Sequence, residues 1–103
     1  MATMKDKMKE IAKNYGYDAQ ARQLIEEMAE LTVTLNKDWR GKKGYIPYDE
    51  HVARQKIIEE IADVEVVLEQ IKYLMDCDYE VFKEKMHKVD STMERMNLSE
   101  GTI

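Results

Sequence analysis

The sequence predicts an all-α fold, a four-helix bundle in one domain spanning 1–103, and three observations support this prediction. Apolar residues recur at helical spacing along most of the chain, and no convincing strand is found. One proline and four glycines leave few breaks in the pattern. Charged residues make up 36% and hydrophobic residues 44% of the 103 residues, as is typical of a soluble, helix-rich domain.

The first expected helix spans 4–15. Thr3 with Asp6 is expected to cap its start, and Gly16 is expected to end it. Four apolar residues form its stripe at helical spacing: Met4, Met8, Ile11 and Tyr15.

The second expected helix spans 19–37, with Asp18 as its N-cap. Its apolar stripe consists of Leu24, Met28, Leu31 and Leu35. The connector DWRGKKGYIPY (38–48) follows, and its two glycines and Pro47 predict the one long loop of the chain.

The third and fourth expected helices span 50–75 and 79–96, with Asp49 and Asp78 as N-caps. The core is expected over 17–96, and the tail 97–103 is expected to fray. The third helix carries apolar residues on its far side as well, at Ile58, Val66 and Tyr73. Apolar groups on more than one face indicate burial between subunits, so the bundle is expected to be completed by oligomerisation.

Composition argues against several classes of partner. The net charge is -5, and no basic face is evident beyond a short cluster around Lys42, so no nucleic acid is expected. The single cysteine, Cys77, favours a reducing compartment. No signal peptide or membrane span is evident, and we expect no membrane partner and a cytoplasmic location.

One carboxylate lies where an acid is costly. Glu60 occupies the middle of the apolar stripe of the third helix, and Asp63 lies about 60° to one side of it. A buried, unpaired carboxylate costs several kcal/mol, so such a group normally acquires a partner or a metal ion.

A second acidic pair borders the stripe of the preceding helix, at Glu27 and Glu30. If these two helices are antiparallel neighbours, the four carboxylates meet around one or two ions. Ligation by oxygen alone suits hard cations such as Mg²⁺, with Mn²⁺ as a substitute. The alternative is that the acids form structural ion pairs with Lys or Arg on neighbouring helices.

EEMAE (26–30) followed by EEIAD (59–63) resembles the EExxE…ExxD signature of the MazG-like nucleoside triphosphate pyrophosphohydrolases. The resemblance implies a hydrolase that cleaves between the α- and β-phosphates to release a nucleoside monophosphate and pyrophosphate. It further implies a homotetramer, with a dimer second. The segment 31–59 between the motifs is at or beyond the long end for this family, which leaves the substrate open.

The resemblance also assigns roles to individual acids. Glu26 would bind a further ion or help to activate the attacking water. The magnesium ligands would be Glu27, Glu30, Glu60 and Asp63.

Basic and aromatic residues are candidates for substrate binding. Trp39 would stack on the base with Arg40, Lys42 and Lys43 near the phosphates, or else pack on its own bundle among solvated lysines. Lys88 and Arg95 share one face of the last helix, which is similar to the basic C-terminal helix of phage-type MazG-like proteins. There they would reach phosphate oxygens, and the alternative is a solvated or ion-paired face.

Three readings of function remain open. The first is a pyrophosphohydrolase that acts on NTPs or dNTPs. The second is a specialised enzyme for dUTP, dCTP or phosphoribosyl-ATP. The third is a non-catalytic helical interaction protein that keeps the scaffold. A di-iron reading of the ExxH pair at Glu84 and His87 would require a second such motif, and the sequence has one.

Overall fold

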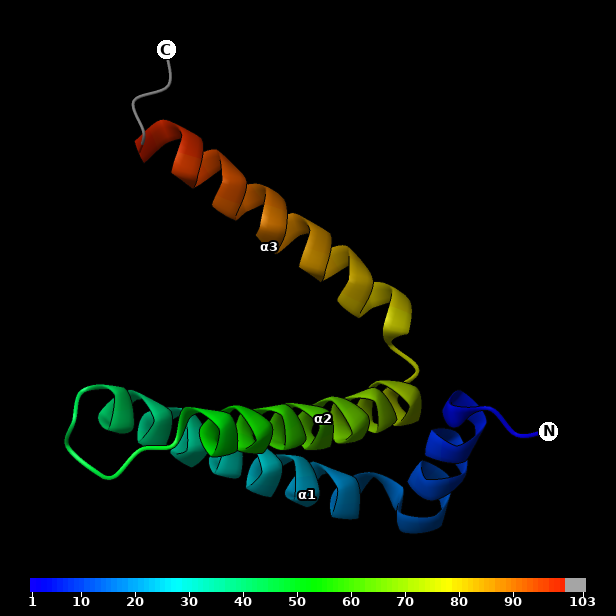
Figure 1. The fold of residues 1–103 in the computed structure, drawn as a ribbon. Coiled ribbons are helices and arrows are strands. Elements are labelled where there is room, and N and C mark those ends of the chain that lie inside the picture. Colours follow the sequence, from blue (N-terminus) through cyan, green and yellow to red (C-terminus); the bar gives the residue numbers. More distant parts are fainter. Residues whose placement is uncertain (100–103) are drawn as a thin grey trace.

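The computed structural model describes residues 1–99, and these residues are almost entirely helical (Figure 1). The three helices are α1 (Met4–Lys42), α2 (Glu50–Met75) and α3 (Asp78–Ser99). No strand occurs within 1–99. The all-α prediction is therefore confirmed. None of the described helices has both the length and the hydropathy required to span a lipid bilayer.

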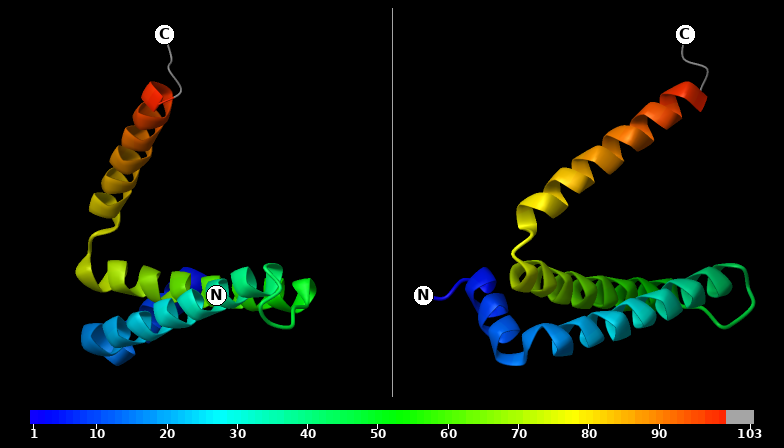
Figure 2. Two further views of the ribbon diagram at one scale, coloured as in Figure 1. Left: turned by 90° about the vertical axis from the view of Figure 1, so that its left-hand side faces the viewer. Right: turned by 180° about the vertical axis from the view of Figure 1, so that it is seen from behind.

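Helix α1 is sharply kinked at Gly16, so it has two arms. Gly16 has φ 83° and ψ 172°, a conformation that glycine adopts without the steric cost of a side chain. The break expected at this residue is confirmed. The chain is helical again immediately after Gly16, so Asp18 lies in the first turn of the second arm and does not cap it, contrary to the prediction. The first arm lies across one end of α2 (Figure 2).

The predicted capping box at the start of α1 is present. The amide of Asp6 donates to Thr3 Oγ1 at 3.0 Å, and the amide of Thr3 donates to Asp6 Oδ2 at 3.1 Å. Further along the same arm, Ala12 is fully buried, and the ammonium groups of Lys9 and Lys13 lie 5.4 and 5.9 Å from the centre of the Tyr73 ring on α2. These contacts hold the first arm against the end of α2.

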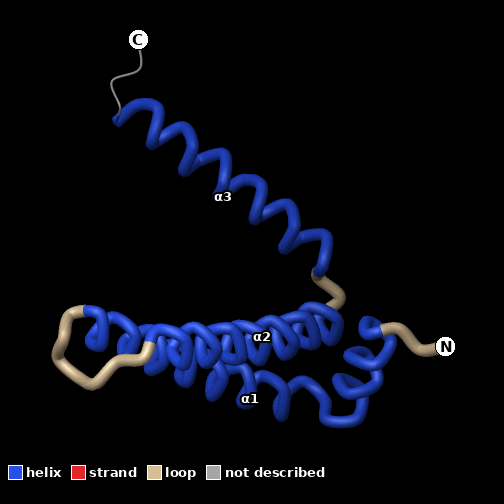
Figure 3. The backbone as a smooth tube through the Cα atoms, viewed as in Figure 1, coloured by secondary structure: helices blue, strands red, loops and turns tan. Residues whose placement is uncertain are grey.

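The second arm of α1 is longer than predicted, because it continues to Lys42 and includes the first part of the expected connector. Gly41 does not break the helix, since the Tyr48 ring packs directly on its backbone. The helix ends at Lys42, with Lys43 as its C-cap; Gly44 follows with φ 82°, and the amide of Tyr45 donates to the carbonyl of Arg40 at 2.9 Å. The loop is therefore restricted to residues 43–49 (Figure 3).

Helix α2 returns antiparallel along the second arm of α1, and together they form a helical hairpin (Figures 1 and 2). Asp49 caps α2 as predicted, since Asp49 Oδ1 accepts a hydrogen bond from the amide of Val52 at 3.1 Å. Gln20 and Gln70 are both buried, and the Gln20 amide donates to the side-chain carbonyl of Gln70. Because each amide needs the other, this pair fixes the register between the two helices.

Helix α3 contacts the hairpin only at its N-terminal end and projects away from it (Figures 1 and 2). Cys77 occupies the position expected for Asp78 as the cap, because the carbonyl of Cys77 accepts the first helical hydrogen bond, from Val81, at 3.0 Å. The helix continues to Ser99, past the end expected at 96. The rest of the predicted frayed tail, 100–103, lies outside the described residues.

One chain does not close into a four-helix bundle by itself. Its radius of gyration is 18.0 Å, whereas a compact chain of this length has a value of about 13 Å. Helix α3 leaves a row of large apolar side chains exposed, at Phe82, Met86, Val89 and Met93. Among the described residues, the buried hydrophobic side chains are those of Ala12 and Val67. The hairpin is thus the one packed unit that positions a site.

Candidate metal centre

Four carboxylates from the two helices of the hairpin lie together. Glu27 and Glu30 come from the second arm of α1, and Glu60 and Asp63 come from α2. One oxygen from each lies within 4.8 Å of the oxygens from the other three. Residues three apart share one face of a helix, so two antiparallel helices in this register bring both pairs to the same point of their interface.

Glu60 is the most deeply buried of the four, and its side chain is 3% exposed. Its Oε1 atom pairs with Lys56 Nζ, one helical turn earlier, at 2.9 Å. Its Oε2 atom is buried and has no hydrogen-bond partner within the described chain. A buried carboxylate oxygen without a partner is costly, so this atom is suited to accept a cation.

Glu27 is half-buried and resembles Glu60 in having one bonded and one orphan oxygen. Gln23 Nε2 donates to Glu27 Oε1 at 2.6 Å, whereas Glu27 Oε2 is buried and lacks a partner among residues 1–99. Burial raises the pKa of Glu27, and the nearby carboxylates of Asp63 and Glu30 raise this pKa further, against the opposing effect of Gln23. The surroundings therefore disfavour negative charge at Glu27.

Glu30 and Asp63 are exposed and open the group to solvent on one side. The donor set thus consists of two orphan oxygens in the interior and two accessible carboxylates beside them. Four carboxylate ligands without nitrogen or sulfur match the preferences of Mg²⁺ or Mn²⁺. The residues present therefore fit the expected hard cation.

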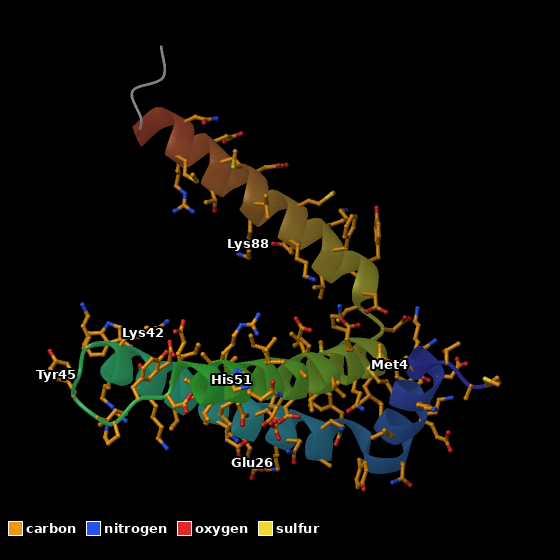
Figure 4. The ribbon with its side chains drawn as sticks, viewed as in Figure 1. Met4, Glu26, Lys42, Tyr45, His51 and Lys88 are labelled. Carbon is orange, nitrogen blue, oxygen red and sulfur yellow. The ribbon has the colours of Figure 1, made fainter. Side chains whose placement is uncertain are left out.

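Glu26 is not part of this group. Its side chain is exposed and lies on the side of α1 that faces away from α2 (Figure 4). The structure consequently brings together four of the five acids that the sequence predicts as catalytic, and leaves the fifth on a neighbouring face.

The aromatic and basic residues predicted near the nucleotide lie at the far end of the hairpin. Trp39 and Arg40 are in the last turns of α1 rather than in a loop, contrary to the prediction, and Lys43 follows the helix. Trp39 is nine positions after Glu30, which is about 14 Å of helix axis and about half a turn of rotation. Trp39 is 54% exposed and contacts Tyr45, with ring centres 5.9 Å apart, and the Lys43 ammonium. None of the three reaches the carboxylate group.

Lys88 and Arg95 lie on the projecting helix α3 (Figure 4). Arg95 Nη2 donates to Thr92 Oγ1 at 3.1 Å, and that hydroxyl donates to the carbonyl of Lys88 at 2.9 Å. The seven-residue spacing places the two basic residues on one face of α3, which projects away from the hairpin that carries the carboxylates. Glu84 and His87 are also exposed on this helix. The group of residues within 1–99 that could hold a metal ion includes no histidine, so the ExxH pair is not part of that group.

A pocket of about 500 Å³ next to the carboxylates was not predicted from the sequence. It begins one helical turn from them, at Thr34 after Glu30 and at Lys56 before Glu60. The loop residues Ile46, Pro47 and Tyr48 close its other end. Thr34 and Lys56 each lie four residues from a predicted ligand, so helical spacing could have indicated that they lie beside the carboxylates. The loop wall could not be predicted in this way, because it depends on the tertiary contact between Tyr48 and Gly41.

No protein-family model, curated protein or solved structure matches this chain.

Proposed function

We propose that the protein is a Mg²⁺-dependent nucleotide pyrophosphohydrolase that cleaves an NTP or dNTP between the α- and β-phosphates. The observation that carries the proposal is the pair of buried, orphan oxygens, Glu27 Oε2 and Glu60 Oε2, within a group of four convergent carboxylates. Structural ion pairs account for this arrangement less well. In the described chain, the ion pair formed by the four acids is the one between Lys56 and Glu60.

The resemblance to the MazG-like signature involves the same residues. The EExxE motif contributes Glu27 and Glu30 to the group, and the ExxD motif contributes Glu60 and Asp63. The three-residue spacing within each motif places its two acids on one face of a helix, as two ligands of one ion must be. We therefore assign Glu27, Glu30, Glu60 and Asp63 as the residues that hold the ion. When bound, magnesium neutralises charge on the triphosphate and lowers the pKa of a water molecule.

The carboxylates have different tasks in this scheme. Glu60 is fixed by its burial and Glu27 by its hydrogen bond from Gln23, so these two acids set the position of the ion. Glu30 and Asp63 are exposed and face the side from which a triphosphate enters. Glu26 remains a proposed outer ligand or water-activating group on the adjoining face of α1.

We further propose that the working form is a homo-oligomer, with a tetramer favoured over a dimer. The exposed apolar face of α3 and the exposed Ile58 and Val66 on α2 require cover, and a second copy supplies matching apolar faces. Two hairpins packed together would complete a four-helix bundle. Such packing would also carry Lys88 and Arg95 of one subunit toward the carboxylates of another. Light scattering at micromolar concentration tests this, and a monomeric peak would contradict it.

The direct test of the reaction is pyrophosphate release from a panel of canonical, deoxy and damaged nucleoside triphosphates. Activity that requires magnesium, is abolished by EDTA and is lost in Glu60→Gln supports the proposal. The matched control is Glu59→Gln, because Glu59 is the adjacent acid on α2 and is exposed to solvent. No turnover of any triphosphate or of phosphoribosyl-ATP by folded, magnesium-loaded protein would favour a non-catalytic helical interaction protein.

A further inference from the structure

Lys56 lies between the carboxylate group and the neighbouring pocket, and it contributes to both. Its ammonium is 2.9 Å from Glu60 Oε1, and its side chain is part of the pocket wall. The two partners of this ion pair differ in burial, since the Glu60 side chain is 3% exposed and the Lys56 side chain is 58% exposed. The carboxylate is therefore fixed, and the lysine is the partner that is free to move.

Lys56 supplies the one neutralising charge that the four acids receive from a lysine or arginine within 1–99. A divalent cation bound by the same carboxylates would take over this neutralisation and repel the ammonium. The lysine end of this ion pair is largely exposed, so water solvates the Lys56 ammonium when a cation takes its place beside the buried Glu60 carboxylate. The lysine stem reaches the pocket without any change in the helix.

The pocket offers Lys56 a second anionic partner if a nucleotide binds there. It starts one helical turn, about 5–6 Å, from the carboxylates, so phosphates at the ion would continue into it. Its volume of about 500 Å³ lies within the usual range for small-ligand sites. Ile46, Pro47 and Val52 provide apolar wall for the nucleoside part.

We propose that Lys56 is an exchangeable counter-ion: it neutralises Glu60 in the metal-free protein and binds a phosphate oxygen at the mouth of the pocket once a divalent cation is in place. This inference rests on the proposed function, because it takes the four carboxylates as the metal ligands. It adds a phosphate ligand that neither motif contains, and it assigns the adjoining pocket to the nucleoside.

The test uses two probes on the full chain, Mn²⁺ alone and then inorganic tripolyphosphate on the Mn²⁺-loaded protein, both by titration calorimetry. In Lys56→Met the competing ammonium is absent, so Mn²⁺ should bind at least about threefold more tightly than in wild type. Tripolyphosphate should bind about tenfold more weakly, because a charge-assisted hydrogen bond to phosphate is lost. The opposite signs of the two changes are the signature of an exchangeable counter-ion.

Lys42→Met is the matched control for the Mn²⁺ titration. Lys42 also forms an i, i+4 ion pair, at 3.0 Å from Asp38, and its side chain is 60% exposed; Asp38 lines the pocket but lies outside the carboxylate group. The variant should leave the Mn²⁺ affinity within about twofold of wild type. Lys56→Arg keeps the charge and should restore tripolyphosphate binding. Circular dichroism of each variant checks that the helices are intact.

The outcomes separate this inference from the function on which it rests. If wild-type protein binds no Mn²⁺, the metal centre itself is refuted. If wild type binds Mn²⁺ but Lys56→Met binds it equally or more weakly, Lys56 is only a structural partner of Glu60 and the exchange is refuted. If Mn²⁺ binding tightens while tripolyphosphate binding is unchanged, the assignment of Lys56 to phosphate is refuted.

Discussion

Replacing Glu60 by glutamine should make the metal-free protein more stable and the metal-loaded protein less stable than wild type. The substitution keeps the shape of the side chain and removes its charge. Four acids whose ligand oxygens lie within 4.8 Å of one another repel. At an effective dielectric constant near 20, one such pair costs about 3.5 kcal/mol before screening. The variant also loses the ion pair with Lys56, which is worth about 0.5 kcal/mol.

After screening by solvent at the two exposed acids, we expect Glu60→Gln to gain about 1–3 kcal/mol in the free energy of unfolding without metal. Metal binding should reverse this order of stability, so that wild type becomes more stable than Glu60→Gln. A ligand at one hundred times its Kd stabilises the folded state by about 2.7 kcal/mol, which corresponds to about 11–22 °C in Tm for a domain of this size. Wild type should show this rise, and Glu60→Gln should show little of it.

The assay is thermal unfolding followed by circular dichroism, in EDTA and in magnesium, at one protein concentration because association also shifts Tm. Glu59→Gln, at the exposed neighbouring acid, should behave as wild type in both conditions. A Glu60→Gln variant that melts below wild type in EDTA, together with a wild-type Tm that does not respond to magnesium, would refute the reasoning. Glu60 would then be a structural partner of Lys56.

Three further predictions concern the hairpin. Gln20→Leu should lower the free energy of unfolding by about 1–3 kcal/mol, because it leaves the buried Gln70 amide unpaired; urea unfolding measures this, and the double Leu variant should recover most of the loss. Gly41→Ala places a Cβ atom 2.8 Å from Tyr48 Cγ and should lower Tm despite the better helix propensity of alanine; an unchanged Tm would contradict the packing. Burial raises the pKa of Glu27 above its usual value of 4.5, so the folded state holds this proton more tightly and the contribution of Glu27 to stability is lost as pH rises through the raised pKa. In EDTA, wild type should therefore lose Tm relative to Glu27→Gln as pH rises above 4.5, and a constant difference would argue against a buried acid.

Much of the secondary structure follows from local signals. The Thr3–Asp6 box, the kink at Gly16 and the cap at Asp49 each depend on residues within a few positions of one another. The placement of the carboxylates also follows from periodicity, since the spacing within each motif sets the face. The sequence could thus predict which acids lie on the facing sides of two helices.

The remaining features depend on contacts that no local pattern encodes. Gly41 reads as a helix break, but the Tyr48 ring covers it and the helix continues to Lys42. The apolar stripe of α3 predicts that this face needs cover, but it does not specify whether the cover comes from the same chain. The sequence does not single out Lys56, because exposed lysines are common and only the burial of its partner Glu60 distinguishes this one.

The origin of all four carboxylates in one helical hairpin has a consequence for the order of folding. Helices α1 and α2 are joined by the short loop 43–49, so the group forms by local closure of the chain, which is a fast event. In the oligomer that we propose, covering the exposed face of α3 with a second copy would be bimolecular, and its rate would depend on protein concentration. The acids would then meet before the subunits do, and their repulsion would oppose the early step. A divalent cation should accordingly accelerate closure of the hairpin and leave the rate constant of association unchanged.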